Sequence, residues 1–260
     1  MNPLTFLSTT GGVFMTFLTA TGRLSLFTFT ALYHAVTPPF YPRLIVQQMI
    51  SIGYFSLPVV GLTAIFTGMV LALQSYTGFS RFSAESAIPN VVVLSITREL
   101  GPVLAGLMVA GRVGAAMAAE IGTMRVTEQI DALVTLSTNP FKYLVGPRLI
   151  AGVTMLPILV LIADVIGILG GYLVSVYKLG FNPTTYLINT WNFFEVEDLN
   201  SGLIKAAVFG FIISLLGCYN GYNSRGGAQG VGAATTTAVV TASILILCSD
   251  YFLTELLFSQ

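Results

Sequence analysis

The sequence predicts an all-α integral membrane protein, with an N-terminal interfacial helix, five transmembrane helices and a cytoplasmic segment between the second and third spans. Of the 260 residues, 55% are hydrophobic and only 8% are charged, against about 25% charged in a typical soluble domain. The mean hydropathy is +0.84. A chain so poor in charge cannot cover a surface that faces water on all sides.

The composition also argues against several classes of site. Eleven basic residues balance eleven acidic ones, whereas nucleic-acid binding needs clustered Lys and Arg. His34 is the single histidine, so a multi-histidine metal site is excluded. Cys218 and Cys248 lie in apolar runs, where buried packing is the ordinary use of cysteine. No metal or cofactor is therefore expected.

Residues 1–45 form the first predicted region. The N-terminus lacks the basic segment of a signal peptide, no charge precedes Arg23, and glycines interrupt its apolar run. These features favour a helix lying along the membrane interface over a cleaved signal.

Residues 46–260 form the predicted transmembrane domain. A spanning helix needs about 20 apolar residues. Five segments meet this requirement, at residues 49–73, 88–112, 149–177, 203–222 and 235–258.

The distribution of basic residues predicts the orientation of these spans. Five spans put the two termini on opposite sides of the membrane. With the N-terminus cytoplasmic, inside segments hold most basic residues, and the outside loops hold only Arg81 and Lys178. The positive-inside rule thus predicts a cytoplasmic N-terminus and a periplasmic C-terminus.

The connection at residues 113–147 is then cytoplasmic. Thr127 and Glu128 are expected to open a helix within it. A shallow apolar face is predicted from Ile121, Met124, Ile130 and Leu133. Small residues recur at every fourth position before it, at Ala110, Gly114, Ala118 and Gly122. This spacing lets two helix backbones approach closely, as do Gly167 with Gly171 and Gly217 with Gly221.

Several motifs resemble the MlaE/YrbE permease family. They are R-E-L-G-P at 98–102, A-G-R-V-G-A-A-M-A-A-E-I-G-T-M at 110–124, V-T-E-Q-I-D-A-L at 126–133, G-P-R at 146–148, K-A-A-V-F-G at 205–210 and G-G-A-Q-G-V-G-A-A-T-T at 226–236. The resemblance extends over about residues 45–258.

The resemblance implies a function and a set of partners. It implies a non-catalytic permease subunit of an ABC transporter in the bacterial inner membrane, which moves phospholipids or related lipids between membranes and maintains the lipid asymmetry of the outer membrane. The implied assembly is a homodimer with two cytoplasmic ATPase subunits, an MCE-domain protein and, in some systems, a STAS-domain protein.

The glycine-rich stretch at residues 226–232 agrees with a separate ATPase. It lacks the lysine with which a P-loop holds nucleotide phosphates, so ATP is expected to bind a partner chain. We expect this stretch to form a flexible cytoplasmic turn.

Charged residues within the spans are the sharpest candidates for a lipid path. A charge at the bilayer centre costs about 2.5–3.5 kcal/mol on insertion scales. Arg98 and Glu99 are adjacent and need not pair, so Glu99 is expected to face a cavity while Arg98 reaches another partner. Lys205 and Asp250 lie at similar depth, and they either form a packing ion pair or line the outer end of the path. Asp164 is a further polar residue, with no predicted partner.

Two more groups are candidates on weaker grounds. Apolar walls of the path are predicted from Phe66, Met69, Leu73 and Tyr76, although such side chains also face bulk lipid. An ATPase-coupling surface is predicted from Glu120, Arg125, Glu128 and Asp131, which otherwise form an ordinary solvated face.

Two other functions fit parts of the pattern. An ion-coupled secondary transporter would use Glu99, Asp164 and Asp250 as proton relays and would need no ATPase. An intramembrane aspartyl protease would use Asp164 and Asp250, but the sequence around both lacks the G-x-G-D motif of those enzymes.

Overall fold

The computed structural model describes residues 3–258, apart from the side chains of residues 3–11, 13 and 17. The predicted domain limits at residues 1 and 260 lie outside this range. Helices with short connections make up the described part, which contains no strand, and the predicted all-α class is confirmed. The longer helices are α1 (Pro3–Val36), α2 (Pro42–Ile52), α3 (Leu57–Phe79), α4 (Ile88–Ser95), α5 (Gly101–Val109), α6 (Ala115–Val126), α7 (Gln129–Thr135), α8 (Gly146–Tyr177), α9 (Pro183–Phe193), α10 (Val196–Tyr222) and α11 (Gly227–Phe258). Short turns of tighter or wider helix join them: η1 (Tyr54–Ser56), η2 (Ser80–Phe82), η3 (Glu85–Ala87), η4 (Ile96–Leu100), η5 (Ala110–Gly114) and η6 (Phe141–Val145).

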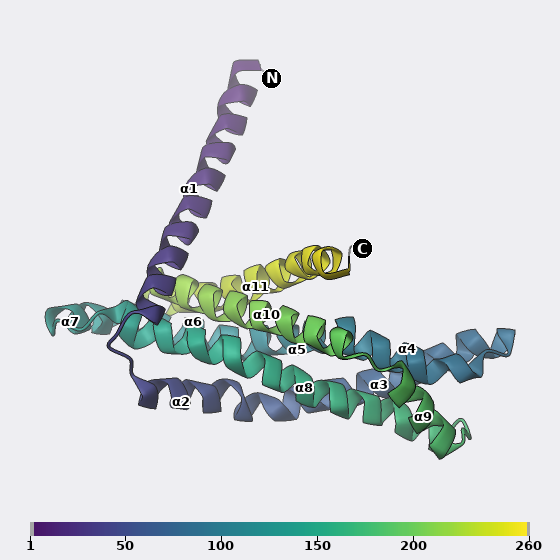
Figure 1. The fold of residues 1–260 in the computed structure, drawn as a ribbon. Helices are drawn as coiled ribbons and strands as arrows, with labels where there is room; N and C mark the ends of the chain where they lie inside the picture. Colours follow the sequence, from purple (N-terminus) through teal and green to yellow (C-terminus); the bar gives the residue numbers. More distant parts are fainter. Residues whose placement is uncertain (1–2, 259–260) are drawn as a thin grey trace.

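Five segments of the described chain are long and apolar enough to cross a membrane, as predicted. They are Pro42–Phe82, Glu85–Val126, Phe141–Tyr177, Val196–Tyr222 and Gly227–Phe258. Helix α8 lies at the centre of the bundle and packs against α3 and α10, which run alongside it (Figure 1). Each segment contains one of the predicted spans and extends beyond it.

Helix α1 leaves the bundle crosswise to the spans (Figure 1). Its C-terminal half packs on η6 and α8, where Phe27 and Ala31 are buried. The Phe27 ring lies 5.1 Å from that of Phe141 and 5.3 Å from that of Tyr219. A crosswise helix anchored at one end suits the predicted interfacial position, which stays a prediction because the structure contains no membrane.

The first span is interrupted rather than continuous across residues 49–73. Helix α2 ends at Ile52, η1 follows, and α3 begins with Pro58 in its first turn. Because proline has no N–H, it is tolerated at such a start but interrupts the helix before it. Arg112 of the second span supports the break, since its guanidinium donates to the Ser51 carbonyl and, at 3.0 and 2.8 Å, to the Ser56 hydroxyl.

The second span continues through α6 well past its predicted end at residue 112. Helix α7 then opens after Glu128, as predicted, and Glu128 has a left-handed backbone with φ of 59°. The predicted apolar face is not available to a partner, because Ile121 and Ile130 are fully buried. It packs against α1, α8 and α10, and the exposed apolar side chains of this region are instead Val134 and Leu136.

The prediction of a flexible turn at residues 226–232 is wrong. Helix α11 begins at Gly227, so only residues 223–226 form the turn, and Gly226 supplies a φ of +89°. A side chain on Gly230 would collide with the Arg225 carbonyl. The glycines therefore let the first turn of α11 fold tightly over the preceding chain.

The predicted rows of small residues pack helices within the chain. A Cβ on Gly217 or Gly221 would lie 3.1 Å from the Gly114 carbonyl or 2.9 Å from the Ala118 carbonyl, so α10 lies directly on the second span. A Cβ on Gly68 would collide with the Gly167 carbonyl, which brings α3 equally close to α8.

We expect Gly68→Ala to destabilise the bundle by about 1–3 kcal/mol, because the added methyl group forces α3 away from α8. Thermal unfolding of the purified chain in detergent measures this. Gly78→Ala is the matched control in the same helix, since nothing lies within 4 Å of its added Cβ. Equal unfolding temperatures for the two variants would contradict the close packing.

Candidate functional site

The Arg98–Glu99 pair lies on a π turn, η4, in the middle of the second span. Pro102 follows this turn and has no N–H, so it cannot donate the usual helical hydrogen bond to the carbonyl four residues earlier, that of Arg98. The Gly101 N–H bonds to the Ile96 carbonyl with the wider π spacing. The Arg98 carbonyl is left to accept a bond from elsewhere. Single π turns within α-helices are frequent at functional sites.

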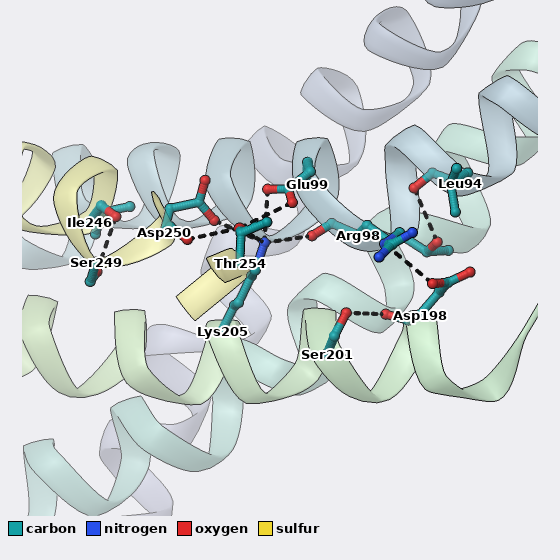
Figure 2. A network of polar contacts seen from close by, with 11 residues as sticks. Leu94, Arg98, Glu99, Asp198, Ser201, Lys205, Ile246, Ser249, Asp250 and Thr254 are labelled. Carbon is teal, nitrogen blue, oxygen red and sulfur yellow. Dashed lines mark hydrogen bonds and ion pairs between the residues drawn. The ribbon is translucent and has the colours of Figure 1, made fainter. Parts of the chain in front are cut away.

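Lys205 of α10 supplies the missing donor and joins three segments of the chain (Figure 2). Its ammonium donates to the Arg98 carbonyl at 3.1 Å, the Glu99 carboxylate at 2.8 Å and the Thr254 hydroxyl at 2.7 Å. It also lies 3.2 Å from the Asp250 carboxylate. The predicted pairing of Lys205 with Asp250 is therefore confirmed, and Glu99 shares the same lysine.

The three charged groups differ in exposure. The Lys205 side chain is fully buried, whereas those of Asp250 and Glu99 are 20% and 38% exposed. Removing one partner of a buried ion pair is strongly destabilising, because the remaining charge is left uncompensated. With all three groups ionised, two carboxylates share one cation, and the more open of them, Glu99, is free to meet a further group.

Arg98 points away from Glu99, as predicted, and reaches two other residues. Its guanidinium lies 3.3 Å from the Asp198 carboxylate in the first turn of α10 (Figure 2). Its Cζ atom also lies 3.4 Å from the centre of the Phe258 ring. Arg98 thus ties the end of α11 and the start of α10 to the π turn.

The sequence did not identify Asp198, Thr254 or Phe258 as members of this site. Asp198 follows Glu195 and Glu197 in a short acidic run just before the predicted fourth span, a position typical of an exposed loop, yet it is buried. Thr254 lies four residues after Asp250, which puts both on one helix face, and this spacing was the available signal. Nothing in the sequence around Phe258 distinguishes it from the other aromatic residues of the spans.

An apolar groove borders the π turn. Phe66 is exposed on α3, and Leu100 follows Glu99 directly. With Thr67, Val70, Leu71 and Gln74 they line a hollow of about 420 Å³. Of the other predicted wall residues, Met69 and Leu73 are half-buried on α3. Tyr76 packs instead against Phe181, with ring centres 6.1 Å apart, and does not line this groove.

The predicted coupling residues form two separate ion pairs. Glu120 bonds to the buried Arg148 of α8 at 2.8 Å, which ties its exposed carboxylate to α8. Arg125 bonds to Asp131 at 2.8 Å across the turn between α6 and α7. Glu128 is exposed at that turn. The two ion pairs do not close this surface, because the side chains of Glu120 and Asp131 are still 58% and 61% exposed.

A five-span helical bundle with paired charges at membrane depth defines a multi-pass membrane protein with polar groups inside the bilayer, where such residues ordinarily serve function. The model of the permease MlaE family matches residues 45–256 of this chain. The chain belongs to the MlaE permease family.

Named relatives support this assignment. The chain is 64% identical over 242 residues to a probable ABC transporter permease protein of Rickettsia felis, with 93% of each chain covered. It is 36% identical to the intermembrane phospholipid transport system permease protein MlaE of Haemophilus influenzae, with 97% of each chain covered. It is 39% identical to the chloroplastic protein TRIGALACTOSYLDIACYLGLYCEROL 1 of Arabidopsis thaliana, with 82% of this chain and 61% of that protein covered.

We expect Lys205→Ala to lower the unfolding free energy by about 3–5 kcal/mol, because it leaves Glu99 and Asp250 without their cation. Thermal unfolding in detergent is the measurement, and Lys178→Ala is the control, because Lys178 is exposed at the end of α8. Combining Lys205→Met with Glu99→Gln and Asp250→Asn should recover most of the loss. If Lys205→Ala and Lys178→Ala unfold alike, the cluster does not stabilise the bundle.

Proposed function

We propose that this chain is the non-catalytic permease subunit of an ABC transporter that moves phospholipids, or related lipids, between membranes and so maintains the lipid asymmetry of the outer membrane. One observation carries the proposal: a partly exposed carboxylate, Glu99, lies next to an apolar groove at membrane depth. A phospholipid has the matching combination of a charged headgroup and acyl chains. The printed name of the Haemophilus relative, a phospholipid transport permease, supports the same function.

The lipid path is proposed to run along the face that α3, η4 and α11 share. Glu99 and Asp250 would meet the headgroup, with Lys205 holding both carboxylates in place and Arg98 tying the π turn to α10 through Asp198. Phe66 and its neighbours in the groove would contact acyl chains, together with Met69 and Leu73. Tyr76 is the weakest member of this set, because it packs under Phe181.

A homodimer is proposed because this face exposes large apolar side chains beside the charged cluster. Phe66 and Val70 of α3 are 61% and 55% exposed, and Tyr251 of α11, next to Asp250, is 67% exposed. A second copy covering this face would enclose Glu99 in a cavity shielded from bulk lipid. An MCE-domain protein is the proposed partner at the periplasmic end.

The opposite end, around α7, is proposed to bind the cytoplasmic ATPase subunits, and a STAS-domain protein is the proposed further partner on that side. Glu128, Asp131, Val134 and Leu136 are among the exposed residues there, and the ion pair of Arg125 with Asp131 links α6 to α7 across the turn. Glu120 would act indirectly, through Arg148. This orientation puts the chain in the bacterial inner membrane with a cytoplasmic N-terminus and a periplasmic C-terminus.

A photoreactive amino acid at position 66 tests the lipid path. We expect it to capture phospholipid that remains after extensive detergent washing, because the groove retains it beside Glu99. Mass spectrometry of the crosslinked chain is the measurement. Val165 is the matched control, since it is 62% exposed against 61% for Phe66 and lies on α8. Equal capture at both positions would point to bulk lipid and against a path.

Reversing the charges of Glu128 and Asp131 together to Arg tests the ATPase surface. We expect transport to fall by at least about tenfold while the chain stays folded, because like charges across an interface oppose docking. Co-purification of the ATPase and transport in proteoliposomes are the measurements. Glu195→Arg, in an exposed position at the other end of the bundle, is the control. Normal assembly and transport in the double variant would contradict the proposed ATPase surface.

A further inference from the structure

Asp164 is a buried acid that the charged cluster does not use. It lies in the middle of α8, and the residue is only 3% exposed. Neither of its carboxylate oxygens has a hydrogen-bond partner among the described residues. A polar group buried at this depth without a partner needs a physical explanation.

The carboxyl group of Asp164 lies against the π turn that carries Arg98 and Glu99. Its Oδ1 atom occupies the space that a side chain on Gly101 would fill, so the glycine is what permits the approach. The Ile96 carbonyl oxygen borders the same space, 2.8 Å from the position of the missing Cβ. That carbonyl already accepts the Gly101 N–H, and it has a second lone pair available for another donor.

The elements around Asp164 offer no free cation. Helices α3 and α5 contain no charged residue. The charged groups of η4 and α10 are already engaged, Arg98 with Asp198 and Glu99 with Lys205. The other charged residue of α8, Arg148, lies about 24 Å away along the helix axis and pairs with Glu120.

An uncompensated carboxylate in such surroundings is strongly disfavoured, and a buried acid takes up a proton instead. A protonated carboxyl group has one O–H donor. The free lone pair of the Ile96 carbonyl is the acceptor that borders the same space.

We propose that Asp164 is a proton-binding site within the bilayer, where its neutral carboxyl donates to the Ile96 carbonyl and holds the π turn from α8, as Lys205 holds it from α10. Asp164 is thus a positioning residue for Glu99. Its effect on transport rests on the proposed function, but its protonation does not.

Infrared spectroscopy of the full chain in lipid bilayers at neutral pH tests the protonation directly. The C=O stretch of a protonated carboxyl group is well separated from the bands of a carboxylate. We expect this stretch in the wild-type chain, its loss in Asp164→Asn and its retention in Asp250→Asn. Identical spectra for the wild type and Asp164→Asn in this region would overturn the proposal.

Lipid transport in proteoliposomes that contain the complete transporter tests the positioning role. Asp164→Asn should keep transport within about twofold, because its amide N–H donates to the same carbonyl. Asp164→Val, without a donor, should lose about fivefold, the ratio that corresponds to one net hydrogen bond. Gly101→Ala should resemble Asp164→Val and add little to it in the double variant, because both changes remove the same contact.

Three results would overturn the positioning role: a loss in Asp164→Asn as large as in Asp164→Val, wild-type transport in Asp164→Val, or fully additive losses in the double variant. Thermal unfolding checks that Asp164→Val remains folded. We expect that it does, because valine is apolar and leaves no unsatisfied polar side chain in the buried position. A wild-type chain that moves no lipid would defeat the proposed function, while the infrared result still decides the state of Asp164.

Discussion

A lysine ammonium buried at membrane depth must find oxygen atoms for its protons, since no bulk water reaches it, and the core of this protein is arranged around that requirement. Lys205 obtains them from a backbone carbonyl, a carboxylate and a hydroxyl on the second and fifth spans. The carbonyl is available because Pro102 leaves the ladder of the second span one donor short. A local defect in one helix thus becomes the contact that joins three.

Such contacts depend on helices that lie unusually close together. Gly152 and Gly210 bring α8 and α10 together, while Gly217 and Gly221 bring α10 onto the second span. In a bilayer, close packing of this kind replaces the hydrophobic drive that assembles soluble proteins. Because the backbones approach so closely, a side chain as short as Asp164 reaches the backbone of another helix across Gly101.

The two candidate regions both pair their cations within the chain and leave acidic groups partly exposed. At membrane depth, Lys205 and Arg98 are bonded to their partners, and Glu99 keeps an exposed side. At the α7 end, Arg148 and Arg125 bond to Glu120 and Asp131, and these two acids stay exposed together with Glu128. These two surfaces are where the proposed contacts, with lipid at one and with protein at the other, would form.

The sequence by itself determined the class of protein, because apolar runs of the required length and scarce charges have one physical use. It also identified the charged residues Arg98, Glu99, Lys205 and Asp250, and it predicted correctly that the side chains of the adjacent Arg98 and Glu99 point in different directions.

The sequence did not determine the full set of partners of these residues. Glu99 lies 106 residues from Lys205 and 155 from Thr254, and neither distance in sequence carries a signal of contact. Which faces meet depends on the rotation of each helix about its axis, and close backbone contacts at glycines set that rotation only in the folded bundle. The folded bundle likewise decides that Ile121 and Ile130 are buried and that Asp164 lies against the π turn. It also decides that α11 begins within its glycine-rich stretch.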